Sequence, residues 1–390
     1  MFKRLITSTL TQNAQQFPAT LLTGPRQSGK TTLLKSLFPQ YGYANLESPD
    51  TLLRLQGDPR GFLFANKQGW IIDEAQQFPQ LFSYLQECLD EPHRQYPFIL
   101  SGSQNFLLNE QISQTLAGRV AVLELLPLSY AEYLTNPDVK PLPLWQFLYQ
   151  GSYPRPYQEH LDVTIWYNSY IRTYLERDVR TLINVRDLTK FQLFLKLCAG
   201  RHGQLLNLSS LAQDCGISQT TATEWLSVLE NSYIIYRLSP HYKNFNKRLV
   251  KTNKLYFYDT AIVSHLLGIE SPDHLQIHAQ RGFIFEGFVL TEIIKFYLAQ
   301  GKKAPIYFWR DQTGTEIDVI LEKGEELIAI ELKSTATFTV DLLTEIRRWR
   351  KIAGNGVKKA IIIYGGTESF EYDGFSIVSW DKCAEFLTHI

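Results

Sequence analysis

The sequence has little cysteine and no excess of either charge. Its four cysteines, Cys88, Cys198, Cys215 and Cys383, lie far apart and form no C-x-x-C pair. This spacing argues against a zinc ribbon or a disulfide framework and fits the reducing cytosol. Lysine plus arginine and aspartate plus glutamate both number 39, so a nucleic-acid site has to be a local patch. The sequence also lacks an apolar run of about 18 residues and an N-terminal signal-peptide core. We therefore expect a cytoplasmic protein with no membrane partner.

The length of 390 residues is too great for one hydrophobic core, so several domains are expected. A hydrophobic content of 44% and a charged content of 20% are those of an ordinary globular protein. Strand-like apolar runs and helical segments predict a multidomain α/β protein. The motifs described below divide it into residues 1–129, 130–199, 200–268 and 269–390.

A phosphate-binding loop is the most specific motif in the chain. The pattern G-x-x-x-x-G-K-[ST] is matched at every fixed position, after a strand-like run and before a helical segment. Its glycines let backbone N–H groups turn toward phosphate oxygens, and the helix start adds unpaired donors. Lys30 is expected to reach the β- and γ-phosphates of ATP, and the Thr31 hydroxyl to hold Mg²⁺. The predicted nucleotide-binding residues are Gly24, Pro25, Arg26, Gln27, Ser28, Gly29, Lys30, Thr31 and Thr32.

An apolar run that ends in two carboxylates, Ile71-Ile72-Asp73-Glu74, follows the loop. Asp73 at the strand tip is expected to bind the Mg²⁺ shell, and Glu74 to orient and polarise the attacking water. A strand end with solvated charges gives the same string. Its distance from the phosphate-binding loop favours the Walker B motif of an ATPase.

Two further residues are candidates for the same site. Ser103 follows the third apolar run and is predicted to sense the γ-phosphate, with Gln104 and Asn105 as alternatives and a strand-to-loop cap as the structural explanation. Arg119 precedes the last strand-like run of this part. An arginine there can complete the ATP site of a neighbouring subunit, and a surface salt bridge is the structural alternative.

Together these residues resemble a known family. The chain is similar to bacterial and archaeal AAA+ ATPases with a C-terminal restriction-endonuclease-like domain. The segments that carry this similarity are Gly24–Thr31, Ile71–Glu74, Ser101–Gln104, Leu116–Arg119 and Leu125–Ser129. The resemblance covers nearly the whole chain. It implies ATP hydrolysis with Mg²⁺, a homo-oligomer such as a hexamer, and a helical lid in residues 130–199. The aromatic residues of that lid are expected to form core rather than a stacking platform for bases.

Residues 207–258 have the pattern of a winged helix. A helical segment that ends at Gly216, a Ser218 cap and a second helix over 219–230 predict a helix-turn-helix. Two strand-like runs follow, separated by a basic segment with Lys243, Lys247, Arg248, Lys251 and Lys254. Such a wing commonly contacts DNA phosphates, although winged helices also serve as protein-interaction modules. The outward positions of the second helix hold no lysine or arginine, so we expect selectivity for DNA structure rather than sequence.

The C-terminal part contains two alternating strands, 315–321 and 327–333, whose register follows from the turn between them. A two-residue turn that begins at Gly324 places Asp318 directly opposite Glu331 on one face of the sheet. Opposed like charges destabilise a strand pair by about 0.2–1 kcal/mol. A divalent cation between the two carboxylates would explain why both are present.

The spacing D-x₁₂-E-x-K, formed by Asp318, Glu331 and Lys333, resembles the core of PD-(D/E)XK nucleases. The resemblance implies that the two carboxylates bind Mg²⁺ and that Lys333 positions the hydrolytic water and stabilises developing charge. Glu286 lies in the apolar stripe of a helical segment, where a carboxylate needs a partner, and the family places a further metal ligand on such a helix. The alternatives are a solvated strand face with Lys333 paired to Glu316, and a nuclease fold without catalysis.

Three functions are compatible with these motifs. The first is an ATP-driven DNA-processing enzyme that cuts phosphodiester bonds with Mg²⁺. The second is a nucleotide-gated DNA-binding switch or remodeller whose nuclease-like domain is inactive. The third, a small-molecule P-loop kinase, explains the phosphate-binding loop but leaves the C-terminal half without a purpose.

Overall fold

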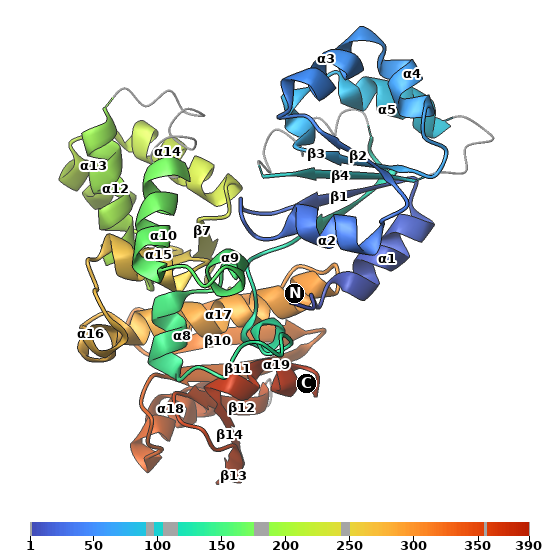
Figure 1. The fold of residues 1–390 in the computed structure, drawn as a ribbon. Coiled ribbons are helices and arrows are strands. Elements are labelled where there is room, and N and C mark those ends of the chain that lie inside the picture. Colours follow the sequence, from blue (N-terminus) through green and yellow to red (C-terminus); the bar gives the residue numbers. More distant parts are fainter. Residues whose placement is uncertain are drawn as a thin grey trace. The chain divides into compact units, whose positions relative to one another are not determined.

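The computed structural model describes residues 2–90, 97–103, 116–174, 187–242, 250–354 and 357–389 (Figure 1). They form two compact units, which are treated separately here. The first unit holds residues 1–128 together with 231–233 and 297–302. The second holds residues 129–230, 234–296 and 303–390. The finer division of the second unit at residues 199 and 268 stays a prediction.

The first unit is built on a parallel sheet whose described strands have the order β2-β3-β4-β1-β5. The strands are β1 (Ala19–Thr23), β2 (Gly42–Asn45), β3 (Trp70–Asp73), β4 (Phe98–Gly102) and β5 (Val120–Glu124). The helices are α1 (Thr7–Gln16), α2 (Lys30–Leu37), α3 (Pro49–Gly57), α4 (Pro59–Phe64), the 3₁₀ turn η1 (Ala75–Gln77) and α5 (Leu81–Asp90). The strands predicted from the apolar runs are confirmed, and β4 is inserted between β1 and β3.

Helices cover both faces of this sheet, which explains why its strands are continuous apolar runs. Successive side chains of β1 enter different cores: Leu21 packs in the cluster that contains Phe82 of α5, and Leu22 in the cluster that contains Leu10 of α1 and Leu34 of α2. All strands run in the same direction, so the segments that follow β1, β3 and β4 meet at one edge of the sheet. The predicted nucleotide site lies at that edge.

The second unit begins with short helices rich in aromatic residues. They are α7 (Tyr130–Tyr133), α8 (Leu144–Gln150), α9 (Pro154–Gln158) and α10 (Val163–Tyr170). Phe147, Tyr149, Tyr167 and Tyr170 are buried, and Trp166 stacks on Tyr170 with ring centroids 5.1 Å apart. The prediction that these aromatic side chains form core is confirmed.

Three helices and a small antiparallel sheet follow, in the order α12 (Leu188–Gly200), β6 (Gln204–Leu205), α13 (Leu208–Cys215), α14 (Gln219–Asn231), β7 (Ile235–Leu238) and β8 (Lys254–Phe257). Gly216 ends α13 in the left-handed conformation, and the Ser218 hydroxyl accepts a hydrogen bond from the Thr221 N–H at 3.0 Å. The predicted helix-turn-helix elements are therefore present. Lys243, Lys247 and Arg248 of the basic segment lie outside the described residues.

One part of the wing prediction is wrong. Lys254 was expected to be an exposed phosphate contact, but it is only 3% exposed. It points into the protein because it occupies a strand, β8, whose side chains are buried on both faces. Lys251 is exposed, as expected.

The C-terminal region contains a mixed sheet whose described strands have the order β13-β14-β12-β11-β10-β9. The strands are β9 (Ile306–Arg310), β10 (Glu316–Lys323), β11 (Glu326–Lys333), β12 (Val357–Tyr364), β13 (Phe370–Tyr372) and β14 (Phe375–Ser379). The helices of this region are α15 (Thr260–Leu266), α16 (Pro272–Ile277), α17 (Arg281–Ala299), α18 (Thr344–Ala353) and α19 (Cys383–Leu387), with 3₁₀ turns η3 (Val340–Leu343) and η5 (Trp380–Lys382). Among the described residues, no helix combines the length and the apolar composition needed to cross a membrane.

The predicted hairpin register is confirmed from Val319↔Ile330 to Lys323↔Glu326. Gly324 opens the two-residue turn with a φ of +64°. Before Val319, however, the pairing of β10 with β9 shifts by one residue between Ile317 and Ile320. Asp318 lies in this bulge, so regular alternation along β10 stops there. Bulges of this kind re-aim a side chain and often occur beside active sites.

Candidate functional site

The phosphate-binding loop connects β1 to α2, as predicted. Gly24 has a φ of +149°, and a Cβ atom at this position would lie 2.1 Å from the backbone oxygen of Leu125. Gly29 has a φ of +94° and stands at the N-terminus of α2. A side chain at either position would be strained, so the glycines are required by the backbone path of the loop.

Lys30 is buried inside this loop. Its ammonium group donates to the carbonyl oxygens of Gly24 and Pro25, at 2.8 and 2.9 Å. Burial lowers the pKa of Lys30, and attraction to Glu74 and Asp73 opposes that shift. A triphosphate would supply stronger acceptors than two carbonyl oxygens, so the lysine is placed to exchange these contacts for phosphate.

The Asp73 carboxylate accepts four hydrogen bonds from described residues. Its Oδ2 accepts hydrogen bonds from the hydroxyls of Thr31 at 2.6 Å and Tyr43 at 3.0 Å. Its Oδ1 accepts from Ser101 at 2.5 Å and from the N–H of Glu74 at 3.2 Å. The structure thus brings together the predicted partners Thr31 and Asp73. The sequence analysis assigned no role to Tyr43 or Ser101, because a lone hydroxyl on a strand gives no pattern.

Glu74 lies just beyond the strand with φ +54° and ψ +48°, the left-handed region that a residue with a Cβ seldom adopts. Its Oε2 accepts from the Gln76 side chain at 2.5 Å and from the Ser103 hydroxyl at 3.2 Å. Ser103, the predicted sensor, therefore contacts the predicted catalytic carboxylate. The alternatives Gln104 and Asn105 lie outside the described residues, and Gln76 carried no sequence signal.

These residues fit a magnesium nucleotide. A hydroxyl and a carboxylate in contact, Thr31 and Asp73, provide the oxygen ligands that Mg²⁺ prefers. Glu74 lies one residue further, held by two donors, where it can orient a water molecule. The phosphate-binding loop, the predicted metal ligands and Glu74, which is predicted to orient and polarise the attacking water, thus occupy one edge of the sheet.

Arg119 lies elsewhere. Its backbone oxygen accepts from the N–H of Ala19, the first residue of β1, so it stands at the opposite edge of the sheet from the loop. Its guanidinium pairs with Asp90 at 2.7 Å, with both side chains partly exposed. This is the salt bridge given above as the structural alternative. A role toward a neighbouring subunit stays a prediction.

Two residues that the sequence analysis did not name, Arg4 and Tyr233, contact the phosphate-binding loop or the residue before it. Arg4 is buried and donates to the backbone oxygens of Ser28 at 2.8 Å and Leu126 at 2.5 Å, which ties the loop to the segment after β5. The hydroxyl of Thr23, the residue before the loop, lies 2.7 Å from the hydroxyl of Tyr233. Both contacts link residues distant in sequence, so no local pattern could predict them.

In the second unit, Asp318 and Glu331, two of the three carboxylates predicted to bind metal, interact with each other. Glu331 is 2% exposed, and its Oε2 accepts from the Lys333 ammonium at 2.6 Å. Its Oε1 is buried and has no hydrogen-bond donor among the described residues. Burial raises the pKa of Glu331 well above its ordinary value; neighbouring Asp318 raises it further, and Lys333 opposes both effects. Asp318 Oδ2 accepts from the Leu332 N–H at 2.8 Å.

Glu286 of α17 has different partners. Its Oε1 accepts from the Lys254 ammonium at 2.9 Å and from the Tyr256 hydroxyl. Lys254 also contacts Glu316 at 2.5 Å, and Arg310 pairs with the other oxygen of Glu316 at 3.0 Å. Burial raises the pKa of Glu286 to about 7, Lys254 lowers it and the charge of Asp318 adds to the rise.

The expected ligand set of Glu286, Asp318 and Glu331 is therefore not assembled. Among the described residues, no three side chains of His, Cys, Asp or Glu form a group that could hold a metal ion. The reason is that Lys254, a residue expected on the surface, holds Glu286. Asp318 and Glu331 fit a single Mg²⁺ that takes one or two carboxylates and several waters, since Glu331 Oε1 is buried without a donor.

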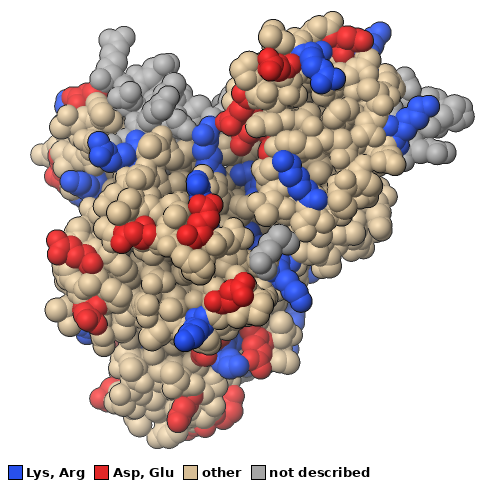
Figure 2. All heavy atoms as spheres, in the orientation of Figure 1, with Lys and Arg blue, Asp and Glu red and all other residues tan. Residues whose placement is uncertain are grey.

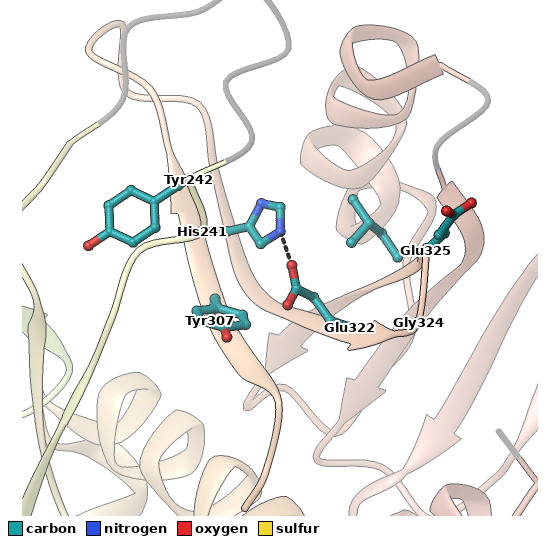
Figure 3. Close-up of a pocket in the computed structure, with 7 residues that line it drawn as sticks. His241, Tyr242, Tyr307, Glu322, Gly324 and Glu325 are labelled. Carbon is teal, nitrogen blue, oxygen red and sulfur yellow. Dashed lines mark hydrogen bonds and ion pairs between the residues drawn. The ribbon is translucent and has the colours of Figure 1, made fainter.

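A cavity of about 640 Å³ lies beside the turn between β10 and β11 (Figure 3). Its walls include His241, Tyr242, Tyr307 and Glu322, and the imidazole Nε2 of His241 is 2.7 Å from Oε1 of Glu322 (Figure 3). It contains none of the residues predicted from the motifs.

Three family models match separate segments of the chain. Residues 16–134 match the family model described as an AAA domain. Residues 143–273 and 281–383 match two domains of unknown function, DUF8612 and DUF4143. The first part of the chain is thus an AAA domain, the class that the strand order and the phosphate-binding loop define, and this supports nucleotide binding and hydrolysis.

Relatives cover most of the chain. The uncharacterized protein Rv2008c of Mycobacterium tuberculosis is 33% identical over 326 residues, which span 82% of this chain and 71% of that protein. An uncharacterized protein of Haemophilus influenzae is 24% identical over 299 residues, 72% of this chain and 68% of that protein. The chain belongs to the family of the mycobacterial protein.

Solved structures resemble the chain more distantly. The Walker-type ATPase PABY2304 of Pyrococcus abyssi is 15% identical, with a TM-score of 0.43, over 68% of this chain and 96% of that one. The Aeropyrum pernix ORC1 protein in complex with DNA is 14% identical, with a TM-score of 0.28, over 67% and 91% of the two chains.

Proposed function

We propose that this chain is an ATP hydrolase that acts on DNA and carries a magnesium-dependent phosphodiester-cleaving site in its C-terminal part. The observation that carries the first half is the arrangement around Asp73, which contacts Thr31 of the phosphate-binding loop and adjoins Glu74. The AAA domain match supports it. The second half rests on the adjacent carboxylates Asp318 and Glu331 and on Lys333 beside them.

At the first site, each side chain has a distinct task. Lys30 and the loop N–H groups would bind the β- and γ-phosphates, and Thr31 and Asp73 would hold Mg²⁺, which would supply positive charge beside the phosphates. Glu74 orients the attacking water and accepts its proton. Gln76 and Ser103 fix the direction of the Glu74 carboxylate, so they are positioning residues.

At the second site, Asp318 and Glu331 would hold Mg²⁺, which acts as a Lewis acid on the scissile phosphate. Lys333 would position the hydrolytic water and stabilise the developing charge. Burial alone would lower the pKa of Lys333, but Asp318 and Glu331 outweigh it and raise the pKa. The lysine is therefore a fixed positive charge and does not serve as the base.

The proposed DNA contact is the winged-helix arrangement of α12 to β8. Gln219, Thr220, Thr223 and Glu224 are exposed on α14, and Lys251 is exposed before β8. On the face drawn in Figure 2, basic and acidic side chains are interspersed. A gel-shift assay with single-stranded, duplex and branched DNA, with and without ATP, tests for DNA binding and for its structure dependence.

ATP hydrolysis is tested with two variants. Lys30→Ala should lose binding of a fluorescent ATP analogue, because the loop loses its phosphate-binding cation. Glu74→Gln should bind the analogue with the wild-type affinity but release no phosphate, because an amide cannot accept the proton of the water. Normal turnover by Glu74→Gln would show that this carboxylate is not the base.

The second candidate function, a nucleotide-gated DNA-binding switch with an inactive nuclease-like domain, is favoured by one observation. Two of the three carboxylates predicted to bind metal already have a cationic partner: Lys333 pairs with Glu331, and Lys254 pairs with Glu286. Nicking of supercoiled plasmid in Mg²⁺ separates the two functions. We expect nicking by the wild type and by Asp341→Ala, which removes an exposed carboxylate, and none by Asp318→Ala. A wild type that binds DNA but never nicks it would favour the switch.

A further inference from the structure

Lys254 reaches the C-terminal carboxylates from β8, a strand of the proposed winged helix. Its ammonium lies 2.9 Å from Oε1 of Glu286 and 2.5 Å from Oε1 of Glu316. The side chains of Lys254 and Glu286 are 4% and 9% exposed, so their ion pair is buried, whereas the Glu316 side chain is 23% exposed. An ammonium group has only donors and cannot ligate a metal. Lys254 therefore occupies, as a cation, the space between two carboxylates that a metal ion would otherwise bridge.

The carboxylates of this cluster fall into two groups. Glu286 and Glu316 have cationic donors, since Lys254 contacts both and Arg310 contacts the second oxygen of Glu316. Glu331 differs, because one of its oxygens is buried without a donor while the other accepts from Lys333. Asp318, the neighbour of Glu331, is itself an acceptor. The unmet demand for positive charge is therefore at Asp318 and Glu331.

The charges of the cluster indicate how much positive charge is missing. The described carboxylates are Glu286, Glu316, Asp318 and Glu331, and the cations paired with them are Lys254, Lys333 and Arg310. When all four carboxyl groups are ionised, as metal binding at this site requires, the carboxylates exceed the cations by one. One divalent ion would reverse this small excess, whereas a second ion would add strong repulsion against the buried ammonium of Lys254.

We propose that Lys254 is a built-in counter-cation that replaces a second metal ion, so that the C-terminal site takes one divalent cation at Asp318 and Glu331, with Glu286 outside its ligands. This inference rests on the proposed C-terminal metal site. Lys254 acts through the carboxylates it holds and is a positioning residue. It also makes the metal site depend on the correct placement of β8.

The test counts bound Mn²⁺ by electron paramagnetic resonance, with calorimetric affinities, on the full chain without nucleotide at pH 8. All variants carry Asp73→Asn to suppress binding at the nucleotide site. The parent should bind one Mn²⁺. Adding Glu286→Gln should leave that affinity within about 3-fold, whereas adding Asp318→Asn should abolish binding. Adding Lys254→Gln should allow a second Mn²⁺.

The matched control is Lys358→Gln, which removes an exposed lysine paired with Glu326 and should leave one Mn²⁺. Two Mn²⁺ in the parent, or a loss of 10-fold or more with Glu286→Gln, would overturn the inference and leave the proposed nuclease site standing. No Mn²⁺ in the parent would overturn both. The parent and Glu286→Gln measurements decide the question even if Lys254→Gln does not fold.

Discussion

Replacing Lys254 with methionine is expected to destabilise the second unit strongly. Methionine retains the aliphatic length but removes the charge that faces Glu286 and Glu316. Removing one partner of a buried ion pair costs about 3–5 kcal/mol, because the remaining charge is left unpaired in the interior. A shift of about 2–4 °C per kcal/mol, typical of domains of about 150–250 residues, gives a fall in melting temperature of roughly 6–20 °C.

The matched control is Lys358→Met. Lys358 pairs with Glu326 at 2.6 Å, but these side chains are 53% and 45% exposed, so the expected cost is below about 1 kcal/mol. Thermal unfolding followed by circular dichroism at pH 8 compares the two variants. The double variant with Glu286→Gln should recover about 1 kcal/mol relative to the sum of the single changes. Equal melting temperatures for Lys254→Met and Lys358→Met would refute the claim that the buried pair matters for stability.

Three more predictions concern pH, turnover and the Mg²⁺ requirement. Folding raises the pKa of Glu286 from 4.5 to about 7. The contribution of this group to stability is therefore complete below pH 4.5 and is lost as pH rises through 7, by roughly 3 kcal/mol. Urea unfolding at pH 5 and 8 should show this loss in the wild type and a smaller loss in Glu286→Gln; an equal loss in both proteins would contradict the prediction. Ser103→Ala removes a donor to Glu74 and should lower kcat about 10-fold, with the KM for ATP changed less than 3-fold. Ser101→Ala removes a donor to Asp73 and should chiefly raise the Mg²⁺ concentration required for turnover. The reverse pattern in the two variants would exclude these assignments.

Local patterns were sufficient to predict where the phosphate-binding loop and the strand that ends at Asp73 lie in the fold. The phosphate-binding loop and Ile71-Ile72-Asp73-Glu74 each combine a fixed spacing with a strand, and parallel strands necessarily bring their carboxyl ends to one edge. The hairpin register also followed from a two-residue turn, because such a turn fixes the pairing. These features depend on residues close in sequence, so the sequence was enough to predict them.

The errors arose where distant segments meet. Lys254 was assigned to an exposed wing from its basic neighbours, but its carboxylate partners lie on α17 and β10, 32 or more positions away in the chain. The bulge at Asp318 depends on pairing with β9, which a two-strand register cannot reveal. Arg4 and Tyr233 reach the phosphate-binding loop only through the tertiary fold.

The two compact units are not successive halves of the polypeptide. Residues 231–233, which include the Tyr233 hydroxyl beside Thr23, and residues 297–302 group with the ATPase core although the segments around them belong to the other unit. The chain passes between the units after residues 128, 230, 233, 296 and 302. A truncation after Leu128 would therefore deprive the remaining ATPase fragment of part of its own packing, and point variants in the intact chain are the sounder means of separating the two proposed activities.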